Sequence, residues 1–299
     1  MREGHMRPAP TILVTGVNGQ VGFELLRTLQ GLGRVVACDR TMLDLSDLDR
    51  VRAVVRDLKP AIIVNPAAYT AVDKAETDVD AARCLNTDVP RVFAEEALRL
   101  NALLVHYSTD YVFDGAKQGV YVETDETNPQ NVYGLTKLDG ERAIAATGCD
   151  HLILRTSWVY GRRGKNFLLT MLKLAAERSE LRVVADQLGA PTWANSIAAV
   201  TAHILAQSMA PNAGNGRAPR SGVYHLAAAG ETSWHGFAQE IFRLALGEKA
   251  PRVLPIAASE YPAPARRPAN SRMCGEKLAS TFGVRMPAWN EALQLCLDS

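Results

Sequence analysis

Short β-branched apolar runs alternate along the chain with longer stretches in which apolar residues recur at helical spacing. The short runs predict strands at 11–15, 34–39, 61–65, 103–108 and 151–156. The longer stretches predict helices at 20–31, 47–58, 80–100 and 131–147. The strands are apolar throughout, which is typical of strands buried on both faces. The pattern therefore predicts an α/β fold with a doubly wound parallel sheet covered by helices on both sides.

Composition narrows the possible partners of this fold. The formal net charge is +1 and the pI is about 7.7, so no general attraction to nucleic acid or to an anionic membrane is expected. The five cysteines are scattered without a C-x-x-C pair, which argues against a disulfide framework or a zinc site and favours the reducing cytoplasm. No apolar run is long enough to predict a transmembrane helix, and no signal peptide is predicted.

A glycine-rich turn follows the first predicted strand directly. The segment TGVNGQVG places Gly16, Gly19 and Gly22 between that strand and a helix that begins near Gln20. Glycines in this position permit a tight turn and let a pyrophosphate approach the positive end of the helix. Asp39 ends the second predicted strand about 20 residues later, where an acid would accept a ribose hydroxyl. We therefore predict a dinucleotide site.

The segment NVYGLTKLDG places Tyr133 and Lys137 four residues apart on a predicted helix. Residues at this spacing share one helix face, so a phenol and an ammonium could reach the same cavity. In ketone reduction, a proton donor must act as negative charge develops on oxygen. We expect Tyr133 to be that acid, with the nearby Lys137 lowering the pKa of its phenol.

We expect the following organisation. Residues 1–10 form an N-terminal extension, of which 1–5 precede an internal Met6. Residues 11–160 form the dinucleotide-binding domain, and a segment near 185–228 returns to it. Residues 161–299 mainly form a smaller C-terminal α/β substrate domain. Two segments rich in proline, glycine or asparagine, 211–222 and 250–271, are predicted to be loops, and the second carries Arg266 and Arg267.

Several longer segments resemble the extended short-chain dehydrogenase/reductases and, among them, the dTDP-4-dehydrorhamnose reductase family. They span most of the chain from Thr11 onward and are GVNGQVG, VNPAAYTAVDKAE, HYSTDYVFDG, NVYGLTKLDGE, LRTSWVYG, DQLGAPT and PARRPANSRM. The resemblance implies reduction of the C4 ketone of dTDP-4-dehydro-β-L-rhamnose with NADPH or NADH. It implies a dTDP-sugar as the small-molecule substrate, with the site in the crevice between two domains.

The resemblance also implies roles for individual residues. At the catalytic centre, Tyr133 would be the general acid, Thr109 would hydrogen-bond the reacting oxygen and Lys137 would hold the nicotinamide ribose. The residues expected to contact the cofactor are Gly16, Gly19, Gln20, Val21, Gly22, Asp39, Arg40, Asp44, Leu45, Ala67, Ala68, Tyr69, Tyr133 and Lys137. The residues expected to contact the substrate are Thr109, Asp110, Trp158, Arg266 and Arg267, with the two arginines on its diphosphate. Tyr69 departs from the family pattern, in which a histidine is familiar.

Two alternative functions remain open at this point. A sugar-nucleotide epimerase or dehydratase would retain its NAD, although dehydration is disfavoured because Asp110 has no adjacent Glu. A non-catalytic dinucleotide-binding subunit, similar to the regulatory subunit of methionine adenosyltransferase, would bind cofactor without turnover. The charged segment AVDKAE, residues 71–76, is interpreted as a solvated helix start without a role, and His106 as a core residue.

The resemblance bears finally on metal and assembly. Some family members are thought to dimerise through magnesium held by glutamates from both subunits. Glu24 occupies the first of these positions, but Asn195 occupies the second. Since magnesium prefers carboxylate and water oxygens, we expect no bridging metal, no metal requirement for the chemistry, and a monomer or weak homodimer.

Overall fold

A computed structural model describes residues 9–209 and 220–299. Most of the predicted N-terminal extension and most of the predicted loop at 211–222 lie outside the described residues. The first strands and helices are β1 (Thr11–Val14), α1 (Gln20–Thr28), β2 (Arg34–Ala37), α2 (Leu48–Leu58) and β3 (Ile62–Asn65). Next come α3 (Val72–Ala75), α4 (Val79–Arg83), a π-helical turn (Cys84–Asp88), α5 (Val89–Leu100) and β4 (Leu103–Thr109). A 3₁₀ turn (Asp110–Val112), α6 (Val132–Thr147) and β5 (His151–Thr156) complete the first half.

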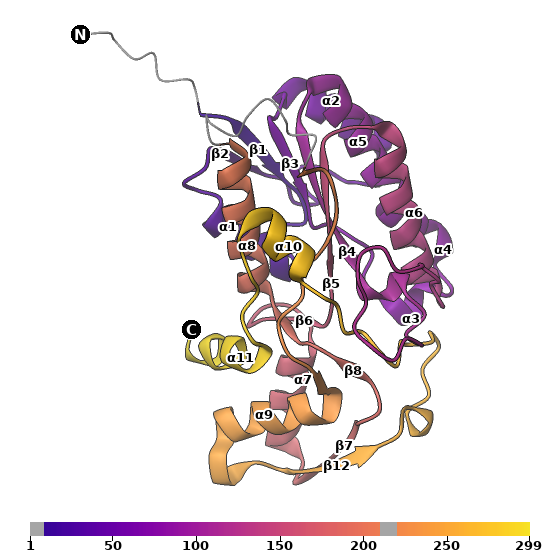
Figure 1. The fold of residues 1–299 in the computed structure, drawn as a ribbon, viewed down its shortest axis with the longest axis vertical. Coiled ribbons are helices and arrows are strands. Elements are labelled where there is room, and N and C mark those ends of the chain that lie inside the picture. Colours follow the sequence, from indigo (N-terminus) through magenta and orange to yellow (C-terminus); the bar gives the residue numbers. More distant parts are fainter. Residues whose placement is uncertain (1–8, 210–219) are drawn as a thin grey trace, which may run out of the picture.

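The remaining elements alternate between two parts of the molecule. They are β6 (Val159–Tyr160), α7 (Phe167–Glu177), β7 (Glu180–Val184), β8 (Leu188–Gly189), β9 (Thr192–Trp193), α8 (Ala194–Met209) and β10 (Gly222–His225). After them come β11 (Thr232–Ser233), α9 (Trp234–Leu246), a 3₁₀ turn (Gly247–Lys249), β12 (Arg252–Ile256), a second such turn (Ala258–Glu260), α10 (Glu276–Phe282) and α11 (Trp289–Asp298). Figure 1 shows β7, β12, α7 and α9 beside one another, away from the β1 to β5 sheet.

The central sheet confirms the predicted fold class. Its six strands run in the order β10-β5-β4-β3-β1-β2, and every pair is parallel. The chain goes from β1 outward to β2 and then crosses to β3 on the other side of β1, so the order reverses between β1 and β3. In open α/β sheets, ligands bind at such a reversal, beyond the carboxyl ends of the strands. The fold therefore places a crevice where the glycine-rich turn leaves β1.

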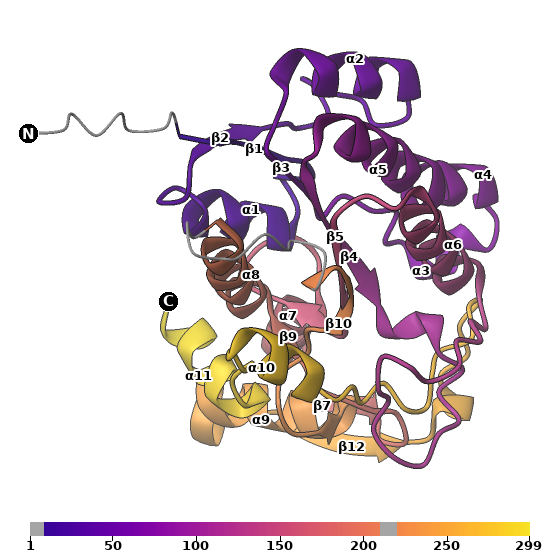
Figure 2. The ribbon, with the colours of Figure 1, turned by 45° about the horizontal axis from the view of Figure 1, so that its top comes forward.

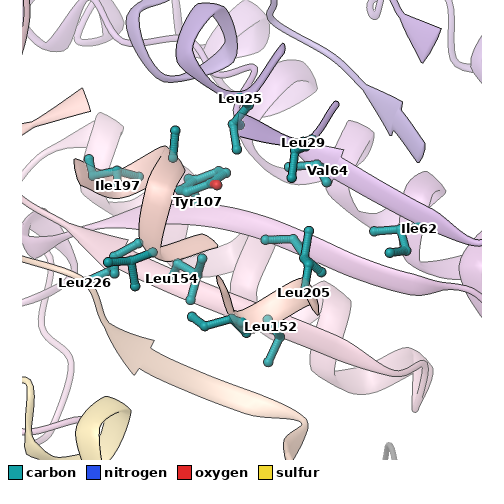
Figure 3. Close-up of a cluster of buried hydrophobic side chains, with 14 of the residues drawn as sticks. Leu25, Leu29, Ile62, Val64, Tyr107, Leu152, Leu154, Ile197, Leu205 and Leu226 are labelled. Carbon is teal, nitrogen blue, oxygen red and sulfur yellow. The ribbon is translucent and has the colours of Figure 1, made fainter. Parts of the chain in front are cut away.

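Helices cover both faces of this sheet (Figure 2). Alternate strand residues point to opposite faces, as the period of a strand requires. On one face, Leu25 and Leu29 of α1 and Ile197 and Leu205 of α8 pack on the sheet (Figure 3). On the other face, α2, α5 and α6 cover the alternate strand residues. Both faces are therefore sealed, which explains the continuously apolar strands.

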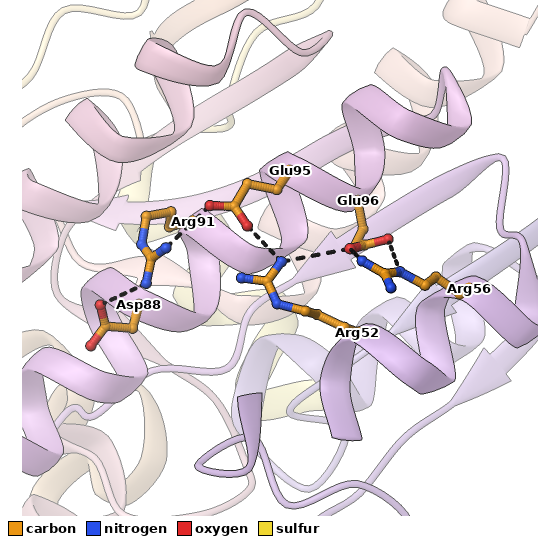
Figure 4. Close-up of polar contacts among 6 residues, drawn as sticks. All are labelled: Arg52, Arg56, Asp88, Arg91, Glu95 and Glu96. Carbon is orange, nitrogen blue, oxygen red and sulfur yellow. Dashed lines mark hydrogen bonds and ion pairs between the residues drawn. The ribbon is translucent and has the colours of Figure 1, made fainter. Parts of the chain in front are cut away.

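Ion pairs join two of the helices on the second face. Glu96 of α5 is almost fully buried, and Arg56 of α2 pairs with it at 2.6 Å (Figure 4). Arg52 contacts both Glu95 and Glu96, which extends the network along the helix pair. Arginine suits this position because its guanidinium group offers several donors in a fixed plane to a buried carboxylate.

A second hydrophobic cluster lies among α7, α9, α11 and the β7–β12 pair. The chain leaves this cluster at α8, which packs on the central sheet, and at β10, which is a strand of that sheet. It leaves again at α10, which packs on the sheet through Leu278 and Phe282. The later return, at α10, was not anticipated from the sequence. The division of the chain at residue 160 remains a prediction.

The prediction that 250–271 is entirely loop was wrong in part. Residues Arg252–Ile256 form β12, which pairs with β7 in a two-stranded sheet. Pro255 within it suggested a loop, because proline cannot donate a ladder hydrogen bond. In a two-stranded sheet each strand has a free edge, and proline is tolerated there.

Candidate active site

A cavity of about 720 Å³ opens at the carboxyl end of the sheet. It confirms that most of the residues selected from the sequence lie together. Those lining it are Gly16, Gly19, Gln20, Val21, Gly22, Asp39, Arg40, Asp44, Leu45, Ala67, Ala68, Thr109, Asp110, Tyr133, Lys137 and Trp158. Tyr69, Arg266 and Arg267 are not among the residues that line it.

The glycine-rich turn fits a pyrophosphate. Gly16 has φ +57°, and a Cβ there would lie 2.9 Å from the Ala67 backbone. A Cβ on Gly22 would lie 2.2 Å from the Gly16 carbonyl oxygen, so the helix can approach the turn only with glycine here. Helix α1 begins after Gly19 without a side-chain cap. Its first backbone N–H groups therefore remain available to an anion at the cavity wall.

The loop after β3 is held from below by Asn86, in the π-helical turn. The Asn86 side chain accepts a hydrogen bond from the Tyr69 backbone N–H at 2.8 Å and donates to the Tyr69 carbonyl at 3.2 Å. This places Ala67 and Ala68 on the cavity wall. Tyr69 itself does not line the cavity, and its hydroxyl donates to Asp78 at 2.9 Å. Its predicted place along the cofactor stays a prediction.

The end of the cavity beside Asp39, where the sequence predicted the adenosine, is called the adenosine end. It is open, and its acid is hydrogen-bonded within its own turn. Asp39 accepts hydrogen bonds from the backbone N–H groups of Thr41 and Met42 and from the Thr41 hydroxyl, at 2.7–3.1 Å. These bonds, the Thr41 hydroxyl first, lower the pKa of Asp39. Arg40 is exposed and lines the same end. This end thus presents Asp39, which is held in a turn, next to the exposed Arg40.

Helix α6 brings Tyr133 and Lys137 to the opposite end. Asn131 caps its first turn by accepting from the Gly134 N–H at 2.7 Å, and Gly148 ends it in the left-handed conformation. Thr109 ends β4, and its interaction with the Tyr133 phenol lowers the phenol's pKa. The Thr109 hydroxyl in turn donates to Asp110 at 3.0 Å. The structure therefore brings the phenol, the hydroxyl and the carboxylate together at one end of the cavity.

The prediction that Lys137 lowers the Tyr133 pKa is not supported by these surroundings. Burial first, and Asp110 in addition, raise the pKa of Tyr133 to about 12, although the interaction with Thr109 lowers it in part. Lys137 is engaged elsewhere: its ammonium nitrogen lies 2.5 Å from the Tyr107 carbonyl oxygen and 3.1 Å from His106 Nε2. Burial lowers the pKa of Lys137 itself to about 8. Desolvation thus dominates both groups.

Three buried oxygens on the cavity wall have no hydrogen-bond partner among the described residues. They are the hydroxyls of Ser108 and Thr156 and the second carboxylate oxygen of Asp110. Leaving buried polar atoms unpaired costs about 1–3 kcal/mol each. Burial also raises the pKa of Asp110 to about 6. The residues that carry these oxygens line the cavity, so their polar side chains are placed beside a ligand such as a sugar.

Trp158 lies on the same wall in an unusual backbone conformation. Its φ is +49°, which is uncommon for a residue other than glycine. Its ring stacks on Trp234 with centroids 3.7 Å apart. Gly189 lies so close to the ring that a Cβ there would be 2.6 Å from Trp158 Cε2. Strain of about 1–3 kcal/mol persists where surrounding contacts determine the conformation, which is common at functional sites. The predicted role of Trp158 in substrate binding is consistent with this placement.

The two C-terminal arginines are held outside the cavity. Arg267 pairs with Asp73 at 2.9 Å, and Arg266 contacts the Gln130 side chain at 3.2 Å. Asp73 and Glu76 belong to the segment AVDKAE, which the sequence suggested has no role. Glu76 accepts from the Val132 N–H at 2.9 Å, so this segment positions both the arginine loop and the start of α6. Their partners are more than 50 residues distant, and no local pattern identifies such contacts.

Other cavity residues were missed for the same reason. Thr156 ends β5, Ser157 follows it, and Gly164 and Lys165 lie in the segment after β6; all four line the cavity. For Thr156 and Ser157 a signal was available at the end of the predicted strand 151–156, since the carboxyl ends of parallel strands carry the ligand site. No predicted strand pointed to Gly164 and Lys165. Among residues 9–209 and 220–299, no group of three or more His, Cys, Asp or Glu side chains could hold a metal ion. No helix in that part of the chain could span a membrane.

The fold and this site together define a nicotinamide-dependent oxidoreductase of the short-chain dehydrogenase/reductase class. Residues 10–299 match the family described as the RmlD substrate binding domain. The chain belongs to the dTDP-4-dehydrorhamnose reductase family, as the sequence predicted. That reductase in Burkholderia thailandensis is 53% identical over 292 residues, covering 96% of this chain and 97% of the relative.

Two further comparisons agree. The dTDP-4-dehydrorhamnose reductase of Escherichia coli K12 is 42% identical over 295 residues, covering 96% of this chain and 97% of the relative. The crystal structure of the Bacillus anthracis reductase in complex with NADP superposes with a TM-score of 0.89 at 34% identity, covering 97% of this chain and 99% of that one.

Proposed function

We propose that this protein uses NADPH or NADH to reduce the C4 ketone of dTDP-4-dehydro-β-L-rhamnose, which gives dTDP-β-L-rhamnose. The observation that carries the proposal is that Tyr133, Thr109 and Asp110 line one cavity together with a glycine-rich turn, with Thr109 hydrogen-bonded to Asp110. The reduced nicotinamide, when bound, would supply the hydride. The site residues that the sequence selected remain part of this proposal.

Tyr133 gives its proton to the ketone oxygen as negative charge develops there. A pKa raised to about 12 keeps the phenol protonated at neutral pH, which is the state an acid needs before the reaction. An alkoxide is a stronger base than a phenolate, so the transfer still runs toward the sugar. Thr109 lies beside the phenol and can offer its hydroxyl to the same oxygen when that hydroxyl turns from Asp110 toward the substrate.

The remaining residues bind and orient. Asp110, Ser108 and Thr156 offer their unpaired oxygens to sugar hydroxyls, and Trp158 packs against the sugar or base. Lys137 holds a ribose hydroxyl with the N–H that its protein partners leave free. Arg266 and Arg267 bind the substrate diphosphate, which requires Arg267 to share or leave Asp73.

We further propose a setting for this reaction. The protein acts in the cytoplasm, as a monomer or weak homodimer, without nucleic acid or membrane as a partner. The near-neutral net charge supports the absence of an electrostatic partner. The catalytic chain divides into a dinucleotide-binding part, mainly 11–160, and a substrate-binding part, and the separate hydrophobic clusters support this division.

The test is a coupled assay with dTDP-glucose, the upstream dehydratase and epimerase, and NADPH. We expect loss of absorbance at 340 nm that requires every component, with dTDP-rhamnose as the product. If no NADPH is oxidised and the cofactor still binds stoichiometrically, the regulatory-subunit alternative is favoured instead. Product formed without net oxidation of added cofactor would favour an epimerase or dehydratase.

A further inference from the structure

A row of polar side chains crosses the core beneath the cavity. The Thr15 hydroxyl lies 2.6 Å from Asn65 Oδ1, and the other amide atom of Asn65 lies 3.3 Å from His106 Nδ1. His106 Nε2 then lies 3.1 Å from Lys137 Nζ. All four side chains are at most 1% exposed. The row therefore joins the end of β1, where the glycine-rich turn begins, to the lysine of the catalytic end.

His106 and one carbonyl group are the protein partners of the Lys137 nitrogen. An ammonium group has three donors and no acceptor, and the Tyr107 carbonyl accepts one of them at 2.5 Å. His106 Nε2 can accept the second. Lys137 also lines the cavity, so the third donor remains for a ligand. Removing His106 would leave a buried donor unpaired, which is costly and would loosen the nitrogen.

The charge of the imidazole is compatible with this role. Burial and the neighbouring Lys137 both hold the pKa of His106 well below its ordinary value, so the ring is neutral. A neutral imidazole carries one proton and accepts at its other nitrogen. A charged Lys137 requires the acceptor at Nε2 and the proton at Nδ1. The Asn65 amide meets that proton when its oxygen faces the ring, and amide orientation follows the hydrogen-bond network.

Other charged groups near Lys137 do not replace this contact. Glu141 lies one turn further along α6 and raises the Lys137 pKa, but its carboxylate is held by Arg155 of β5 at 2.6 and 2.9 Å. Asp110 acts on Tyr133 at the start of the same helix. No carboxylate pairs directly with Lys137 among the described residues.

We propose that His106, itself held by Asn65, is a positioning residue that fixes the Lys137 ammonium at the cavity and keeps it charged while the cofactor is bound. The proposal rests on the proposed function, since it gives Lys137 the task of holding the nicotinamide ribose. It concerns binding as well as turnover, so cofactor affinity can test it without any sugar substrate.

Substitution of His106 by two different amide side chains distinguishes its contact with Asn65 from its contact with Lys137. In His106→Gln the longer side chain can still present an acceptor to Lys137, whereas in His106→Asn the amide reaches only the Asn65 side. His225 provides a matched control, because it is also 0% exposed and on a strand of the same sheet but makes no contact with Lys137. NADPH affinity of wild type, His106→Gln, His106→Asn and His225→Gln is measured by fluorescence from pH 6 to 10, with kcat/KM recorded in parallel.

We expect wild-type affinity to fall above a midpoint near pH 8, where Lys137 loses its proton. A hydrogen bond to the charged form favours that form, so its loss in His106→Asn moves the midpoint to lower pH, by about one unit. The kcat/KM of that variant at pH 8 falls about fivefold, because about one half of Lys137 is protonated in wild type and about one tenth in the variant. His106→Gln and His225→Gln keep the wild-type midpoint, although both melt at a lower temperature.

An unchanged midpoint in folded His106→Asn would overturn the proposal, as would an equal shift in His225→Gln. If His106→Asn does not fold, Asn65→Leu takes its place, because it leaves His106 without the group that fixes its proton. A shift to lower pH supports the proposal in that variant too, and no shift overturns it. Failure of the proposed function is distinct: wild type would then bind NADPH with the expected pH dependence but reduce no sugar nucleotide.

Discussion

The two ends of the cavity differ in how their charged groups are surrounded. At the catalytic end, Lys137 is 1% exposed and Asp110 is 3% exposed, and burial moves both pKa values toward neutrality, to about 8 and about 6. At the adenosine end, Asp39 and Asp44 lie near the surface, and local turn hydrogen bonds lower their pKa values instead. Burial penalises the charged form, whereas hydrogen bonds to a carboxylate favour it.

This difference suggests that the buried end carries out the chemical step and that the exposed end binds the cofactor. Groups with pKa values near neutrality can change protonation during turnover, and their geometry is fixed by the surrounding core. The adenosine end keeps constant charges on a loop that solvent reaches, so it can tolerate changes in the ligand. Substitutions at the buried end should therefore affect the rate strongly, and substitutions at the exposed end should change only affinity.

The largest effect is expected for Tyr133→Phe. This change removes the proton donor but leaves the glycine-rich turn and Lys137 in place. The kcat should fall by about 10²–10⁴-fold, the usual contribution of general acid catalysis, with NADPH affinity nearly unchanged. Steady-state kinetics and NADPH fluorescence measure the two quantities. A variant that retains more than half of its kcat would remove Tyr133 from its role.

Gly189→Ala should act on the substrate side of the buried end. A Cβ there would lie 2.6 Å from Trp158 Cε2, so the ring must shift away from its stacked position on Trp234. Overpacking of this kind costs about 1–3 kcal/mol of folding stability. Because the displaced Trp158 ring lines the cavity, the KM for the sugar nucleotide should also rise several-fold. Gly31→Ala is the control, because a Cβ at that position meets nothing within 4 Å. Equal KM values in the two variants would contradict the placement of Trp158.

The pH profile should show the Asp110 carboxyl. Its pKa is raised to about 6, so it is charged above that pH and neutral below it. The neutral form is a weaker acceptor for sugar hydroxyls, and kcat/KM for the sugar nucleotide should fall about tenfold per unit below pH 6. In Asp110→Asn this acidic limb should be absent and kcat/KM low throughout. A limb that persists in the variant belongs to another group.

A smaller effect is expected at the exposed end. Arg40 lines the cavity next to Asp39 and can reach a 2′-phosphate. Arg40→Ala should weaken the binding of NADPH by several-fold, about 1 kcal/mol for an exposed charge pair, and should hardly alter the binding of NADH. We expect wild type to use both cofactors. Dissociation constants for the two cofactors in both proteins provide the measurement, and equal loss for NADH and NADPH would exclude Arg40 from the discrimination.

No effect is expected from removal of metal. Asn195 donates to Glu24 at 2.9 Å within one chain, so the carboxylate already has a partner. With one carboxylate per chain at this position, little charge is available to hold magnesium between two subunits. Activity and sedimentation should be the same with and without EDTA. A dimer that dissociates on chelation would show that other carboxylates supply the missing ligands.

The sequence predicted those features whose cause is local. Strand and helix periodicity located the sheet, and the spacing of Gly16, Gly19 and Gly22 placed the turn at the cavity, because each signal lies within a few residues. The surroundings of Lys137 were not predictable, since Asn65 and His106 meet only when β3 and β4 pair in register. The raised pKa of Tyr133 was not predictable for the same reason. The spacing of Tyr133 and Lys137 shows that they share a helix face, but burial depends on the whole fold.

The separation of the two ends is tested most directly by single-turnover reduction of dTDP-4-dehydro-β-L-rhamnose at saturating NADPH. Saturation removes differences in affinity, so the observed rate reports the chemical step. We predict that Arg40→Ala reacts within about twofold of wild type, whereas Tyr133→Phe is slower by at least about 100-fold. Equal slowing of both variants, or no slowing of Tyr133→Phe, would contradict the assignment of the chemistry to the buried end.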